Sequence, residues 1–340
     1  MLIGRTLSPG ARIAAVLVLL ALALTNLGWI IRDLNEAGRI VDVLWLWTGQ
    51  PARADNGLWA SSALDPQLLM VYVVSAAVVP RSGSTRGVVG TLGLLTVLLR
   101  LPRLWDSRVN VWPLEPGLAT RVDVTTYGTL LLGLVLLVLA LTARRDTASA
   151  AGRPDAEASG GTGTGPGGPP ARPRRWRARV AGVLALALAG VATAWEVHWS
   201  VELSGDSYWD QVWGDRYLFF PLLGSPPGWI RWATLLLLLA VAGTALARAA
   251  VARPLGMTVA GLVAMGHLLT LVGLVRADYL QHLGSADTET HLTFWTSLTG
   301  LPCALLVLVL LLAREAQPPP PSPAGERWAG REDLAPLGER

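Results

Sequence analysis

Charged residues are scarce in this chain, and lysine is absent from it. Only 15% of the 340 residues are charged and 52% are hydrophobic, whereas an ordinary soluble domain carries about 25% charged residues. The shortage of charge is concentrated in apolar runs of about 18 residues or more, each long enough to cross the hydrocarbon core of a bilayer. These runs exclude an ordinary soluble protein and predict an integral membrane protein that contacts the lipid bilayer.

Cysteine and the common catalytic motifs are nearly or wholly missing. The single cysteine, Cys303, lies within an apolar run, so the chain has no internal disulfide and no cysteine-based metal site. The sequence contains no Walker motif, dinucleotide fingerprint or nucleophile elbow. The 28 basic residues are all arginine, and with a net charge of only +4 they are not gathered among aromatics as on a nucleic-acid-binding face. We therefore predict no metal, no cofactor and no nucleic-acid partner.

The apolar runs predict eight membrane-spanning helices, because a backbone within hydrocarbon must satisfy its own polar groups. The predicted spans are residues 12–31, 63–80, 85–104, 124–143, 179–198, 229–249, 255–275 and 294–313. In the third span, Gly87, Gly90 and Gly93 lie on one face, and such small residues allow close helix packing.

The second half of the chain resembles the first. A shift of 167 residues lays residues 11–14 on residues 178–181, Arg81 on Arg248 and Arg86 on Arg253. Each copy then has four spans, and an even number gives both copies the same orientation. The sequence thus predicts an all-α membrane protein of two tandem four-helix repeats, related by a pseudo-two-fold axis along the membrane normal.

Two segments between and after the repeats are too rich in glycine, proline and polar residues to bury a core. The predicted organisation is a first repeat at 1–145, a disordered cytoplasmic linker at 146–175, a second repeat at 176–315 and a disordered cytoplasmic tail at 316–340.

Arginine placement predicts the orientation of the spans. If the N-terminus is cytoplasmic, 18 of the 28 arginines lie on the cytoplasmic side, and 13 of the 15 tryptophans lie in outer loops or at outer helix ends. We therefore expect a plasma-membrane protein with both termini in the cytoplasm. A basic cluster at the end of the linker is expected to contact anionic lipid headgroups. This cluster comprises Arg172, Arg174, Arg175 and Arg177.

Ionisable residues deep within a span are candidates for function, since they are costly to bury in lipid. His267 lies in the seventh span, and the 167-residue shift maps it onto Arg100 in the third. Together with His198 and His282, we take these as candidate ligand-binding residues. The alternatives are that Arg100 extends to the outer surface and that His267 is a neutral imidazole bonded to a neighbour.

Glu196, His198, His267 and His282 could converge on the outer side, but the sequence has no HExxH motif or paired histidines to support a metal site.

Three functions fit these features, and binding or transport is favoured. In the first, a small or lipid-like ligand occupies an outward-facing cavity between the repeats. In the second, the chain is a structural or accessory subunit without catalysis, as its sparse interior polar residues suggest. In the third, it is an enzyme acting on a lipid or isoprenoid at the outer leaflet, with Glu196 or Asp33 as general acid or base. An oligomer, with itself or with another protein, fits all three.

Overall fold

The computed structural model describes residues 7–50, 59–81, 85–105, 117–142, 175–214 and 220–312, and all the regular structure within these ranges is helical. The predicted tail at 316–340 lies outside the described residues, as does the predicted linker at 146–175 apart from Arg175.

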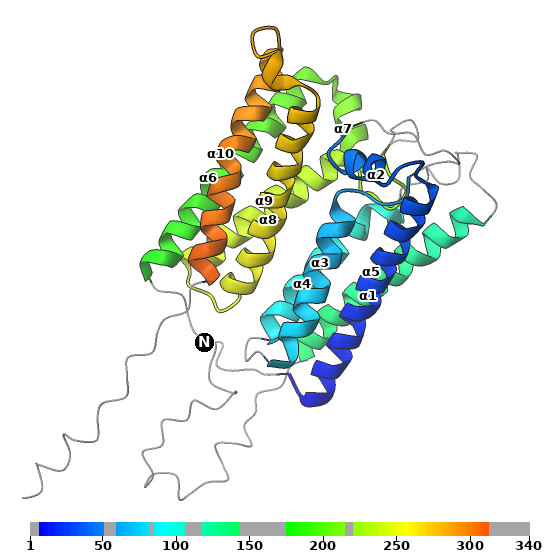
Figure 1. The fold of residues 1–340 in the computed structure, drawn as a ribbon. Coiled ribbons are helices and arrows are strands. Elements are labelled where there is room, and N and C mark those ends of the chain that lie inside the picture. Colours follow the sequence, from blue (N-terminus) through cyan, green and yellow to red (C-terminus); the bar gives the residue numbers. More distant parts are fainter. Residues whose placement is uncertain are drawn as a thin grey trace, which may run out of the picture.

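Within these ranges, seven helices are long and apolar enough to cross a membrane, so the chain is an all-α, multi-pass membrane protein (Figure 1). They are α1 (Pro9–Glu36), α4 with its 3₁₀ continuation η2 (Thr85–Leu104), α5 (Leu118–Thr142), α6 (Arg175–Glu202), α8 (Pro227–Leu246), α9 (Ala252–Arg276) and α10 (Thr288–Leu312). The eighth apolar helix, α3 (Leu64–Val78), has only 15 residues and continues into a 3₁₀ turn, η1 (Val79–Arg81).

Two of the helices start six residues earlier than their predicted spans. Helix α5 begins at Leu118 instead of 124, and α10 begins at Thr288 instead of 294. Hydropathy marks the part of a helix that suits hydrocarbon, whereas the backbone can stay helical beyond it, where polar side chains meet water or headgroups.

The helices form two halves, which we define as residues 7–142 (first half) and residues 175–312 (second half). In the first half α1 packs along α3, and α4 packs along α5. In the second half α6 packs along α8, and α9 packs along α10. Figure 1 shows the halves side by side, and α4 of the first half contacts both α8 and α9 of the second.

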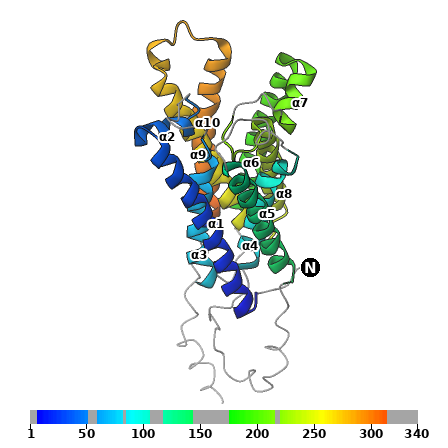
Figure 2. The same ribbon diagram turned by 90° about the vertical axis from the view of Figure 1, so that its right-hand side faces the viewer.

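Short helices cover one end of the bundle. Helix α2 (Ile40–Trp47), helix α7 (Gly205–Trp213) and the 3₁₀ turn η5 (Tyr279–Gln281) all lie at the end opposite to the start of α1 and the finish of α10 (Figures 1 and 2). We call this the capped end; it comprises residues 37–50, 59–63, 203–214, 220–226 and 277–287.

Glycines bring α4 and α5 into close contact, as the sequence predicted. A Cβ atom added at Gly93 would lie 2.8 Å from the backbone nitrogen of Leu137 and 2.9 Å from the carbonyl oxygen of Gly133. A Cβ added at Gly90 would lie 3.2 Å from that of Ala140. The two backbones therefore approach each other more closely than any larger residue at Gly93 would allow.

Candidate functional site

The segment before α8 joins the two halves at the capped end. The backbone nitrogens of Leu222 and Leu223 donate to the carbonyls of Trp59 and Ala60, at 2.9 and 3.0 Å. The indole of Trp229 donates to the carbonyl of Leu98 at 2.9 Å. These hydrogen bonds pair polar groups of one half with backbone carbonyls of the other, and they hold one side of the junction in place.

The end of α2 forms a second junction, on α9. The side-chain amide of Gln50 donates to the carbonyl of Gly273 at 3.2 Å. A Cβ at Gly273 would lie only 2.6 Å from the carbonyl oxygen of Thr48, so this contact requires glycine. The guanidinium of Arg276 lies 5.1 Å from the ring centroid of Trp45, within range of a cation–π interaction.

A cavity of about 720 Å³ is lined by residues of both halves, most of them from the second half. Its lining comes from α2, α3 and α4 of the first half and from α6, α8, α9 and α10 of the second. Most lining side chains are apolar, among them Leu99, Leu188, Leu238 and Leu262, and the single cysteine, Cys303, also lines it. A mostly apolar cavity of this size with a few polar groups is typical of small-molecule sites.

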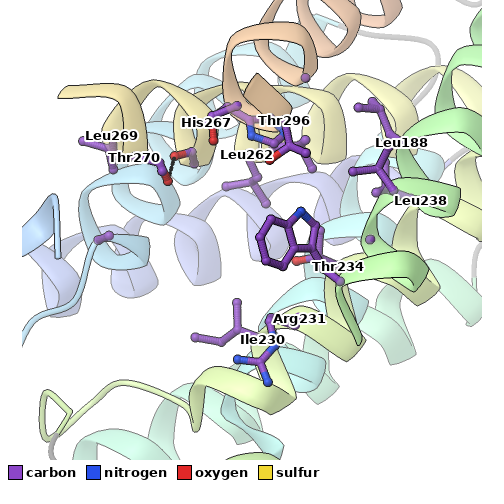
Figure 3. Close-up of a pocket in the computed structure, with 18 of the residues that line it drawn as sticks. Leu188, Ile230, Arg231, Thr234, Leu238, Leu262, His267, Leu269, Thr270 and Thr296 are labelled. Carbon is purple, nitrogen blue, oxygen red and sulfur yellow. Dashed lines mark hydrogen bonds between the residues drawn. The ribbon is translucent and has the colours of Figure 1, made fainter. Parts of the chain in front are cut away.

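His267 is one of the polar groups that line the cavity. Figure 3 shows His267 and Thr270 on one side of the cavity and Arg231 and Thr234 on the opposite side. The imidazole packs onto α10 at Gly300, where an added Cβ would lie 2.7 Å from its Cε1 atom. Within the described part of the chain, neither ring nitrogen of His267 has a hydrogen-bond partner, and Nε2 faces α10 at Gly300.

Glu196 and Arg231 form a partly buried ion pair at the wall of the cavity. The Nε of Arg231 donates to Glu196 at 2.6 Å, and the Tyr208 hydroxyl donates to the other carboxylate oxygen at 2.9 Å. The Trp232 indole in turn donates to the Tyr208 oxygen at 2.9 Å. Burial raises the pKa of Tyr208, so its phenol stays protonated at neutral pH. The Glu196 side chain is 5% exposed, whereas that of Arg231 is 27% exposed.

Arg100 has a different environment from the one expected. Arg100 is not among the described residues that line the cavity. Its side chain is 9% exposed and pairs with Asp65 at 2.7 Å, and it also donates to the carbonyl of Leu223. The other oxygen of Asp65 accepts from the backbone nitrogen of Ser62 at 2.6 Å. Arg100 thus ties the first half to the segment before α8, and neither it nor Asp65 extends to the surface.

Asp33 is completely buried, and its carboxylate is occupied by structural hydrogen bonds. It accepts from the backbone nitrogens of Ala60 and Ser61 and from the Ser61 hydroxyl, and it pairs with Arg32 at 2.8 Å. These bonds hold residues 59–61, whose carbonyls receive the segment before α8. The residues around Asp33 therefore favour a positioning role over general acid or base chemistry.

His198 and His282 are not among the described residues that line the cavity. The ring of His198 contacts the rings of Trp195 and Trp199, at centroid separations of 5.4 and 5.5 Å. His282 is exposed, and its Nδ1 lies 3.0 Å from the carbonyl of Asp278. Among the described residues, no three His, Cys, Asp or Glu side chains lie close enough together to hold a metal ion.

Two residues of the site were missed by sequence reasoning. Arg231 stands at the start of a predicted span, where an arginine is ordinarily read as a headgroup anchor, and Asp65 stands at the start of another. Their partners are distant in sequence, so no local pattern connects the members of either pair.

Comparison with protein-family models, with curated proteins and with solved structures finds no match.

Proposed function

We propose that this chain is a duplicated four-helix membrane unit that binds a small or lipid-like ligand between its two copies. The equivalent pairings of α1 with α3 and α6 with α8, and of α4 with α5 and α9 with α10, support the duplication. Helix α3 with η1 is about 28 Å long at the usual rises of the two helix types, close to the ~30 Å of a bilayer core, which supports an eighth crossing.

The orientation we propose has both termini and residues 146–175 in the cytoplasm of a plasma-membrane protein, with the capped end outside. Of the 13 described tryptophans, 12 lie at the capped end or on the helix segments next to it, as expected of a headgroup layer. Trp176 lies at the other end, in the first turn of α6 beside Arg175 and Arg177. These two arginines, with Arg172 and Arg174 before them in sequence, are the proposed contacts with anionic headgroups.

The cavity of about 720 Å³ is the observation that carries the binding proposal. A purely structural subunit has no need of an apolar space of this volume, because unfilled cavities destabilise a packed interior. Catalysis is disfavoured, since Asp33 and Glu196, the two candidate acids, are occupied by buried hydrogen bonds.

Filling the cavity tests the proposal. Gly266 lines the cavity and has nothing within 4 Å of an added Cβ, so Gly266→Phe should occupy the space that a ligand would take. Gly261 is a matched control, because it lies on the same helix with nothing within 4 Å and outside the described lining. Native mass spectrometry of purified protein should find a bound lipid-like molecule in the wild type and in Gly261→Phe, and lose it in Gly266→Phe.

The structural-subunit alternative makes a different prediction for the same measurement. It requires that wild-type protein and both variants carry the same nonspecific lipid. Equal lipid content in Gly266→Phe and Gly261→Phe would therefore favour that alternative and reject a ligand in the cavity.

A further inference from the structure

We infer that the ligand of this cavity is an amphiphile whose anionic head, a carboxylate or a phosphate, binds Arg231 and whose single apolar chain runs toward Cys303. This inference rests on the proposed function, because it specifies which ligand the same cavity binds.

The head position is set by Arg231. It lies four positions after the start of α8, about 6 Å along the helix axis from the capped end, where lipid headgroups lie. Its Nε donates to Glu196, and its two terminal nitrogens each donate to Oε1 of Gln211 at 3.2 Å. A guanidinium has five N–H groups, so two remain for a ligand. These two N–H groups lie on different terminal nitrogens and point to opposite sides of the guanidinium, so each can donate to a separate acceptor. A charged N–H donor bonds an anionic oxygen more strongly than a neutral group.

The carboxylate of Glu196 orients Arg231 and is not free to bind a cation. Glu196 is the only Asp or Glu among the described lining residues. Its two oxygens accept from Arg231 and Tyr208, and it is 5% exposed. A cationic head would have no accessible carboxylate to bind. An anionic head could bind the guanidinium of Arg231, which is 27% exposed and is oriented by its hydrogen bond to Glu196.

The length of the cavity fits one chain in one leaflet. On α9 the lining runs from Thr270 to Val259, a separation of 11 positions and therefore about 16 Å. Half of a bilayer core of about 30 Å is close to this length. The far part is lined by apolar side chains, including Leu188 and Leu262. His267 lies one helical turn deeper than Thr270 on this path, on the side of the cavity opposite Arg231.

The test compares four amphiphiles of one chain length: a fatty acid, an alkyl phosphate, the fatty alcohol and the alkyl trimethylammonium salt. Binding to the purified full-length protein is measured by titration in one neutral detergent. The fatty acid or the alkyl phosphate, or both, should bind about tenfold or more tightly than the alcohol, since hydrogen bonds to charged groups are worth that much. The preference between the two anions then tells whether the natural head is a carboxylate or a phosphate.

Arg231→Gln should abolish the preference for anions and leave alcohol binding within about threefold of wild type, a change of well under 1.4 kcal/mol. Since this change leaves Glu196 buried without its partner, the double variant Glu196→Gln/Arg231→Gln provides a version without a buried unpaired charge. Arg39→Gln, at an exposed arginine of the same end, is the control for loss of one positive charge and should keep the preference.

The outcomes separate this inference from the proposed function. Equal binding of all four amphiphiles, or tightest binding of the trimethylammonium salt, would overturn the anionic head while leaving the cavity a ligand site. No binding of any of them to wild-type protein, together with no effect of Gly266→Phe on bound lipid, would overturn both.

Discussion

At the scale of single residues, the molecule is organised around carboxylates that are buried and fully bonded. Asp33 holds residues 59–61, Asp65 holds Arg100, and Glu196 holds Arg231. Each joins segments that are distant in sequence. A charge taken out of water is costly unless it is paired and hydrogen-bonded, so removing one partner costs far more than the pair itself contributes.

Arg100→Gln is expected to destabilise the protein by about 3–5 kcal/mol, because Asp65 is left buried without its cation. Thermal unfolding in detergent measures the loss. Arg39→Gln removes an exposed arginine whose side chain is 78% accessible and should change stability by no more than about 0.5 kcal/mol. If the two variants melt alike, the Asp65–Arg100 pair does not stabilise the packing of α3 on α4 as described.

The residue scale is also where sequence reasoning was least informative. It singled out His267, which does line the cavity, since an imidazole within an apolar run stands out. It also singled out Arg100, but the pairing with Asp65 depends on how α3 and α4 pack, which no spacing in the chain encodes. Arg231 was missed for the same reason, because Glu196 lies on another helix.

At the scale of elements, hydropathy located every long helix, and the structure confirms an all-α protein with seven such helices. The short helices α2 and α7 were not predicted. They lie outside the apolar runs, and their positions are fixed by tertiary contacts, such as that of Gln211 on α7 with Arg231 on α8. The cavity depends on α2 as well as on the long helices, since Trp47 of α2 lines it.

Gly93→Ala should weaken the packing of α4 on α5, because its Cβ would meet backbone atoms at 2.8 and 2.9 Å. The expected loss is about 1–3 kcal/mol, the usual cost of overpacking. Gly128→Ala on α5 is the matched control, since an added Cβ there meets nothing within 4 Å. It should be neutral or stabilising by up to about 1 kcal/mol, from the better helix propensity of alanine. Equal melting of the two variants would show that α4 and α5 are not in this close contact.

At the scale of the whole molecule, the two halves have the same helix pairings but different polar residues. Arg100 and His267 are equivalent under the 167-residue shift, yet one is buried in an ion pair and the other lines the cavity. The same shift places Asp65 at Trp232 and Leu64 at Arg231. If the halves are copies, as we propose, the first has kept a structural role in this layer and the second has acquired the polar residues of the cavity.

The proposed orientation predicts which positions an impermeant maleimide reaches from outside the cell. In a Cys303→Ser background, Ser285→Cys at the capped end should be labelled in intact cells. Ser8→Cys, which is also exposed but lies at the other end, should be labelled only after the membrane is opened. Labelling of both positions from outside, or of Ser8→Cys alone, would contradict the orientation.

The most direct test of the central claim, that a ligand-sized space between the halves reaches Cys303, uses this native cysteine as the reporter. The measurement is the rate at which a small apolar maleimide modifies Cys303 in purified protein. The cavity predicts rapid modification in the wild type and in Gly261→Phe, and modification at least tenfold slower in Gly266→Phe, whose new side chain fills the path. Equal rates in Gly266→Phe and Gly261→Phe would mean that reagents reach Cys303 by another route and would contradict the account.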